Sequence, residues 1–100
     1  MTFKVDRTPA VNQQMRDLAQ RAKSRRIHEA YRDALKRVVR HLQDDPLEWG
    51  DPESKTQHPG GFYYHGIEWP LFIRYAVYED EQSVIIYAIT PLPSSPLAGP

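Results

Sequence analysis

The most regular pattern of apolar and polar positions lies in residues 70–91, PLFIRYAVYEDEQSVIIYAITP. Two runs rich in β-branched and aromatic residues, 71–78 and 83–89, flank an acidic turn at residues 79–82. These residue types suit a half-buried pleated surface, so the stretch predicts a β-hairpin. In the first run, alternation places Arg74 among apolar neighbours, which makes it a candidate functional residue.

The second run of this hairpin is apolar on both faces. Alternation places Val84, Ile86 and Ala88 on one face of the strand, and it places Ile85, Tyr87 and Ile89 on the other face. A strand of this kind is typical of the interior of a sheet, covered on two sides.

Residues 9–44 carry two helical patterns with no glycine or proline between them. Thr8 suits an N-cap, and Pro9 suits the first helical position. One continuous helix would be about 54 Å long, whereas a compact chain of this size has a radius of gyration of about 13 Å. We therefore expect a helical hairpin that breaks near Ser24, a candidate second N-cap. The apolar stripes are Val11, Met15, Leu18 and Ala22, followed by Ile27, Tyr31, Ala34, Leu35, Val38, Val39 and Leu42.

The remaining segments complete an α+β domain over residues 1–91. A short strand begins at Phe3, and another covers residues 62–65, between glycines. Residues 46–61 carry no sustained period and predict a loop, and the proline-rich residues 92–100 predict a flexible tail. The expected architecture is an N-terminal strand, a helical hairpin and a three-stranded antiparallel meander. All strands would form one sheet, with the helices on one face.

Composition restricts the class of protein. The chain has no cysteine, which excludes disulfides and permits a reducing compartment. No apolar run approaches the length of a membrane span, and the N-terminus lacks the apolar core of a signal peptide. We expect a cytoplasmic protein with no membrane partner.

A net charge of zero conceals an asymmetry along the chain. Residues 1–40 hold eleven Lys and Arg against four acids, a balance of +7. Residues 41–100 hold two against nine, a balance of −7. The basic half suits an acidic partner such as a nucleic acid, or the two halves neutralise each other across the fold.

The order of these patterns resembles the RelE/ParE superfamily of type II toxins. The resemblance is carried by FKVDRTPAVNQQMRDL at the start, AYRDALKRVVRHLQDDPLEWG at the end of the second helix, and FIRYAVYEDEQSVIIYAIT in the hairpin. It implies a toxin that an antitoxin protein neutralises. RelE-like members cleave mRNA on the ribosome, whereas ParE-like members inhibit DNA gyrase without nuclease chemistry. A catalytically inactive binding protein of the same fold is a further alternative.

The chain departs from the nuclease pattern at two positions and in its net charge, which is zero, whereas nucleases of the family are usually clearly basic. When the strands are aligned on Tyr75, the arginine of RelE-like nucleases falls on Phe72, and Arg74 lies two residues further along. The His or Tyr that often follows the last strand corresponds to Thr90 and Pro91.

Cleavage of RNA through its own 2′-hydroxyl needs a base, an acid and cations that stabilise the transition state. Arg74 and His65, expected opposite each other in the sheet, are the candidates for the phosphate and proton-transfer roles, and Lys55 for the RNA backbone. The alternative is a surface histidine and an Arg74 ion pair with Glu68 or Glu79.

Other residues are candidates for RNA binding. Lys36, Arg37 and Arg40 lie on the basic face of the second helix, and Tyr64 is a candidate for base stacking. A solvated, ion-paired helix face and aromatic core packing are the alternatives. The four histidines show no helical pairing, so no metal site is expected, and no motif predicts a cofactor.

Overall fold

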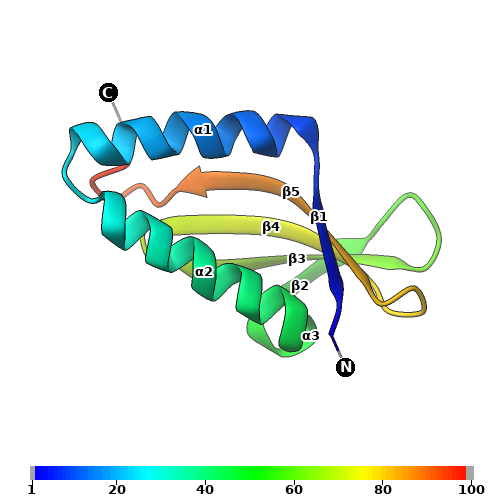
Figure 1. Cartoon of the computed structure of the whole chain (residues 1–100). Helices are drawn as coiled ribbons and strands as arrows, with labels where there is room; N and C mark the ends of the chain where they lie inside the picture. The colour runs from blue at the N-terminus through cyan, green and yellow to red at the C-terminus, as the bar shows by residue number, and fades with distance from the viewer. Residues whose placement is uncertain (1, 99–100) are drawn as a thin grey trace.

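The computed structural model describes residues 2–98 and has two layers, a mixed sheet and a helical layer (Figure 1). Its five strands lie in the order β1-β5-β4-β3-β2. The elements are β1 (Lys4–Arg7), α1 (Pro9–Ser24), α2 (His28–Asp44), α3 (Pro46–Trp49), β2 (Asp51–Lys55), β3 (Gly61–Glu68), β4 (Leu71–Tyr78) and β5 (Ser83–Pro91).

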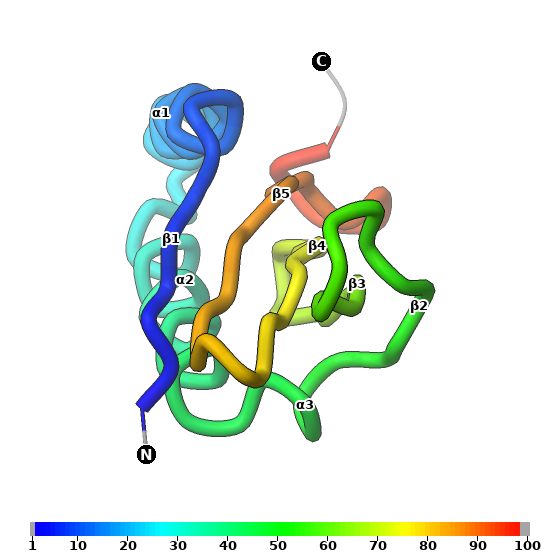
Figure 2. The backbone as a smooth tube through the Cα atoms, turned by 90° about the vertical axis from the view of Figure 1, so that its right-hand side faces the viewer, coloured from blue at the N-terminus to red at the C-terminus, as the bar shows by residue number. Residues whose placement is uncertain are grey.

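Helices α1 and α2 lie side by side on one face of the sheet (Figure 2). Their apolar stripes meet the inward residues of β4 and β5, and this contact forms the core. The opposite face of the sheet is not covered by a helix (Figure 2), and we call it the open face. The largest fully buried side chains include Tyr31, Leu42, Leu71, Ile73, Tyr75, Val77 and Ile89.

The structure confirms the hairpin and the break between the helices. Strand β4 pairs with β5 across the acidic turn, and α1 ends at Ser24. The Thr8 hydroxyl accepts a hydrogen bond from the Val11 amide at 3.2 Å, as expected of an N-cap. Ser24 does not cap α2, because its hydroxyl bonds to the Arg21 carbonyl and Ile27 occupies the N-cap position.

The layout of the sheet differs from the predicted meander. Strand β1 pairs with β5 in parallel, so the sheet is mixed. Residues 46–61, expected to be a loop, contain α3 and the edge strand β2. The prediction missed β2 because every one of its residues is exposed and it contains a proline, so no apolar alternation marks it.

The faces of β5 are also not those predicted by strict alternation. Tyr75 pairs with Ile86 and Arg74 with Ala88, so Tyr87 is an extra residue on β5. This bulge reverses the alternation and turns Ile89 into the core. The strand is interior in the sheet, but helices cover only one of its faces, and Tyr87 is 38% exposed on the other.

The predicted flexible tail is packed where the structure describes it. Leu97 is fully buried, and the Arg21 guanidinium donates to its carbonyl at 2.8 Å. Arg25 donates to the carbonyls of Pro96 and Ala98. The two arginines thus add to the hydrogen bonds that the segment forms with its own amides, and Leu97 provides the apolar anchor. Residues 99 and 100 of the predicted tail lie outside the described residues.

Among the described residues, no helix is both long enough and apolar enough to cross a membrane.

Leu97→Ala should lower the free energy of unfolding by about 2–5 kcal/mol, the usual effect of leaving a cavity at a buried leucine. Ser94→Ala, at an exposed position of the same segment, is the matched control and should change it by less than about 0.5 kcal/mol. Urea titration of both variants measures the difference. Equal midpoints would mean that residues 92–98 contribute nothing to the fold.

Candidate functional site

His65 and Arg74 face each other on the open face. They are Cα partners in the β3–β4 ladder, as the sequence predicted. The neighbours of Arg74 on β4, Ile73 and Tyr75, are fully buried on the other side. The Arg74 side chain is 54% exposed and is therefore accessible to a ligand.

Glu53 joins this pair into one cluster. One of its carboxylate oxygens accepts a hydrogen bond from Arg74 Nη2 at 2.9 Å, and the other lies 3.0 Å from His65 Nδ1. Glu53 lies at an irregularity in β2, since Pro52 pairs with Tyr64 and Ser54 with Tyr63. Glu53 is the extra residue of this bulge, and bulges commonly redirect a side chain next to a functional site.

Two further side chains orient the imidazole of His65. Asp51 Oδ2 lies 3.6 Å from His65 Nε2, so each ring nitrogen faces a carboxylate. The Phe72 ring stacks on the imidazole, with centroids 5.5 Å apart and an interplanar angle of 17°. The ring is therefore held in place on its edges and on one side.

The Glu53 carboxylate is held in its ionised form. Burial acts to raise its pKa, but the hydrogen bonds from Arg74 and His65 and the charges of these two residues outweigh it. The net effect lowers the pKa of Glu53 from its usual value. Glu53 is therefore a proton acceptor at neutral pH.

The cluster combines three functional groups in direct contact. An ionised carboxylate can accept a proton, an imidazole can donate one, and a guanidinium can stabilise an anionic transition state. The guanidinium carries five N–H donors, so its bond to Glu53 leaves donors for phosphate oxygens. We call Glu53, His65 and Arg74 the open-face cluster.

Lys55 and Tyr64 lie on the opposite side of the sheet from this cluster. Lys55 pairs with Phe62, and both line a cavity with Tyr64 and Val77 on the helix-covered side. The bulge at Glu53 reverses the alternation and so separates Lys55 from Arg74. Tyr64 stacks on Tyr75, with centroids 5.5 Å apart, as part of the packing.

The three α2 cations also lie in the helical layer. Arg37 Nε contacts Glu68 Oε1 at 2.5 Å, at the end of β3. Arg74 does not bond to Glu68 or Glu79 as the alternative reading expected, because Glu53 takes that place. Sequence reasoning missed Glu53 because residues 46–61 were read as a loop. The signal that could have identified it is the spacing of Asp51 and Glu53, which places two acids on one face of a strand.

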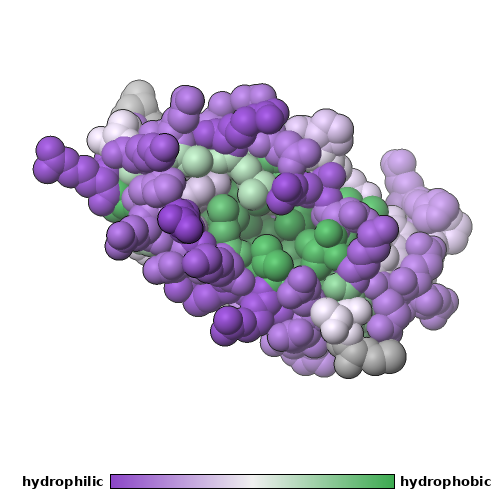
Figure 3. Space-filling view, in the orientation of Figure 1, coloured by the Kyte–Doolittle hydropathy of each residue, from purple (hydrophilic) through white to green (hydrophobic). Residues whose placement is uncertain are grey.

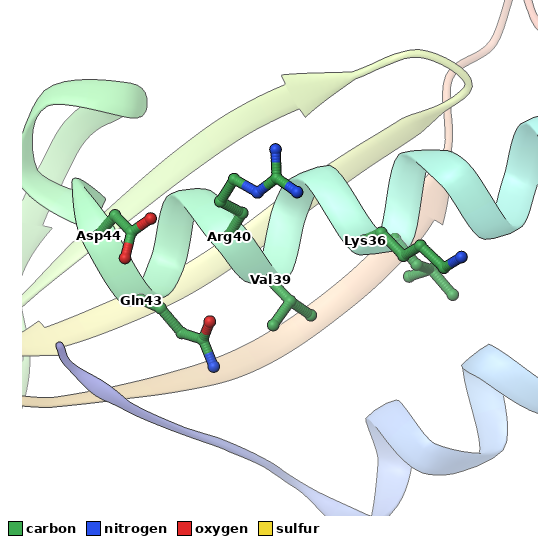
Figure 4. Close-up of a pocket in the computed structure, with 6 residues that line it drawn as sticks. Lys36, Val39, Arg40, Gln43 and Asp44 are labelled. Atoms are coloured by element: carbon green, nitrogen blue, oxygen red, sulfur yellow. The ribbon is translucent and has the colours of Figure 1, made fainter.

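Lys36 and Arg40 border a second surface, a groove beside α2 that we call the helix groove. Figure 4 shows Val39 and Gln43 pointing from α2 toward β1, and both also line the adjoining hollow beside Val5 and Ile86. Figure 3 shows this hydrophobic hollow between the helices, with hydrophilic side chains around it. Val39 is 38% exposed, so the groove presents apolar surface with cations at its border.

Among residues 2–98, no group of three or more His, Asp or Glu side chains is arranged to hold a metal ion.

In an NMR titration of side-chain carboxyls, the pKa of Glu53 in the native protein should lie below the usual value of a glutamate. Arg74→Ala removes a hydrogen bond and a positive charge, so it should shift the midpoint upward. Because the pKa of Glu53 is lowered in the folded state, its ion pairs stabilise the fold above that pH range and lose their effect as the pH falls through it. An unchanged midpoint in Arg74→Ala would rule out this contact.

Comparison with known proteins gives one informative match. No family model matches the chain, and no curated protein matches its sequence. Among solved structures, the fold is similar to that of a chain in the archaeal RelE–RelB complex from Pyrococcus horikoshii OT3, with a TM-score of 0.69. The two chains share 16% sequence identity, and the match covers 95% of this chain and 100% of the other. The chain therefore has a RelE-like fold, as the sequence resemblance predicted.

Proposed function

We propose that this protein is the toxin of a type II toxin–antitoxin pair and that it cleaves mRNA at the open-face cluster. The observation that carries the proposal is the contact of Glu53 with both Arg74 and His65 on a RelE-like sheet. A carboxylate, an imidazole and a guanidinium in contact are the three groups that cleavage of RNA needs.

The reaction uses the 2′-hydroxyl of the RNA as the nucleophile. Glu53 takes the proton of this hydroxyl, and the oxygen forms a bond to the adjacent phosphorus. Arg74 donates to the phosphate oxygens as negative charge develops on them. His65, in its protonated form, gives a proton to the departing 5′-oxygen. The products are a 2′,3′-cyclic phosphate and a free 5′-hydroxyl, and water later restores the two proton-transfer groups.

Ribosome-bound mRNA is the substrate that suits this site. The cluster lies on an open surface, and the carboxylates of Asp51 and Glu53 balance its cations. Affinity for RNA comes largely from unbalanced cations, so free RNA should bind weakly. Presentation of the message by the ribosome supplies the positioning that the site lacks.

The helix groove suits the antitoxin partner. The structurally similar chain comes from a complex of RelE with RelB. In this protein the groove and the adjoining hollow have an apolar floor, including Val39 and Ile86, and Lys36, Arg40 and Asp44 stand beside the groove. An amphipathic segment with acidic residues along its border would match both features.

Inducible expression in a bacterial host tests the nuclease. The native protein should arrest growth and cut mRNA inside translated regions, whereas Arg74→Ala and Glu53→Gln should reduce the cutting about 10²–10⁴-fold. Lys55→Ala is the matched control, because Lys55 lies on the other side of the sheet, and it should remain toxic.

Three outcomes would contradict the nuclease. Growth arrest with intact mRNA and damaged or relaxed DNA would favour a gyrase inhibitor. No arrest would favour a binding protein, and full activity of Arg74→Ala would remove the open-face cluster from the mechanism.

Co-expression with the product of the adjacent gene tests the groove. That product should rescue growth from the native protein, and Val39→Glu should weaken the complex roughly tenfold or more by placing a charge on the apolar floor. Gln20→Glu, an exposed substitution on α1, is the control. Equal rescue and equal affinity for both variants would place the antitoxin elsewhere.

A further inference from the structure

The open face carries more apolar and aromatic surface than folding requires. The uncovered face of an antiparallel sheet is normally polar. Here Ile67 is 57% exposed and Tyr87 is 38% exposed, and Tyr63 and Phe72 are partly exposed on the same face. The helices do not reach these side chains, so the core does not account for them.

The register places these side chains on both sides of the charged cluster. The three neighbouring pairs of the β3–β4 ladder are Tyr63 with Ala76, His65 with Arg74, and Ile67 with Phe72. Two residues along a strand span about 7 Å. Tyr63 and Phe72 therefore lie about 7 Å from the row of His65 and Arg74, in opposite directions along the strands.

The rings are held in place before any ligand binds. The bulge on β5 brings Tyr87 next to Tyr63, with ring centroids 5.5 Å apart in an edge-to-face contact. Burial and the neighbouring Tyr78, which hydrogen bonds with it, raise the pKa of Tyr87, so its hydroxyl is neutral. Phe72 is held by its stack on His65. Fixed rings lose little conformational entropy when a base stacks on them.

We propose that these rings bind the two bases that flank the phosphate held by Arg74, with Tyr63 and Tyr87 on one side and Phe72 on the other. The proposal rests on the proposed function, because it takes the phosphate position from the open-face cluster. An alternation of aromatic, cationic and aromatic rows matches the alternation of base and phosphate in a single strand. In an RNA duplex the bases are stacked inward and cannot lie on a flat protein surface. The substrate class is therefore single-stranded RNA.

NMR spectroscopy tests this with a 2′-O-methylated oligoribonucleotide, about four nucleotides long, at low salt. The methyl group blocks the attacking oxygen, so the native protein binds the probe without cutting it. Ring protons of Tyr63, Tyr87 and Phe72 should shift on titration to millimolar concentrations. Tyr87→Ala and Phe72→Leu should each weaken binding about fivefold to hundredfold, the range measured for loss of one base–aromatic stack.

Matched variants separate stacking from loss of structure. Tyr87→Phe keeps the ring and should bind like the native protein, and Lys55→Ala should do the same. The same probe annealed to its complement should leave the ring signals unchanged. Native affinity in both Tyr87→Ala and Phe72→Leu would overturn the proposal, as would unchanged ring signals with the single strand or equal shifts with the duplex.

The result is distinguishable from failure of the nuclease. If Arg74→Ala abolishes cutting while Tyr87→Ala and Phe72→Leu bind and cut normally, the nuclease stands and the stacking proposal fails. The opposite result is that the native protein never cuts RNA, but Tyr87→Ala and Phe72→Leu bind the single-stranded probe more weakly than the native protein does. In that case the stacking proposal stands and the nuclease fails.

Discussion

The position of Tyr75 constrains the rest of the structure. Its ring stacks between Trp49 and Tyr64, and its hydroxyl donates to the Pro46 carbonyl at 2.6 Å. This single side chain connects the central strand β4 to α3 and to β3. Burial raises the pKa of its hydroxyl, so the hydroxyl stays a donor. Only Gly50 separates α3 from β2, so this contact anchors the segment that leads into the edge strand carrying Glu53.

Two glycines leave room for the close packing of Tyr75 and Trp49. A Cβ on Gly50 would lie about 2.3 Å from the Tyr75 hydroxyl, and a Cβ on Gly66 would lie about 2.5 Å from the Trp49 ring. Trp49 in turn stacks on His41 of α2, with centroids 5.1 Å apart. The helical layer is therefore connected to the sheet through a column of aromatic rings, and the open-face cluster lies on the other side of the same strands.

The two sides of the sheet have different chemical characters, and the charge asymmetry of the sequence follows them. The basic first half forms β1 and the helices, with Lys36 and Arg40 beside the helix groove. The acidic second half supplies Asp51 and Glu53 to the open face. The helical layer thus carries cations beside the groove, whereas the open-face site carries two of the nine acids of residues 41–100. The first suits an acidic protein segment, and the second suits proton transfer.

Elements with local signals can be predicted from the amino-acid sequence alone. Hydrophobic periodicity identified both helices and the central hairpin, Thr8 and Pro9 marked the start of α1, and the pairing of His65 with Arg74 followed from the strand order. The two bulges are visible only in the tertiary structure, which shows that they turn Lys55 away from the open-face cluster and Ile89 into the core. The tertiary structure also decided the packing of Leu97. The physical reason is that periodicity and capping act within a few residues, whereas a bulge or a docked tail is stabilised by partners distant in the chain, which alternation along one strand cannot reveal.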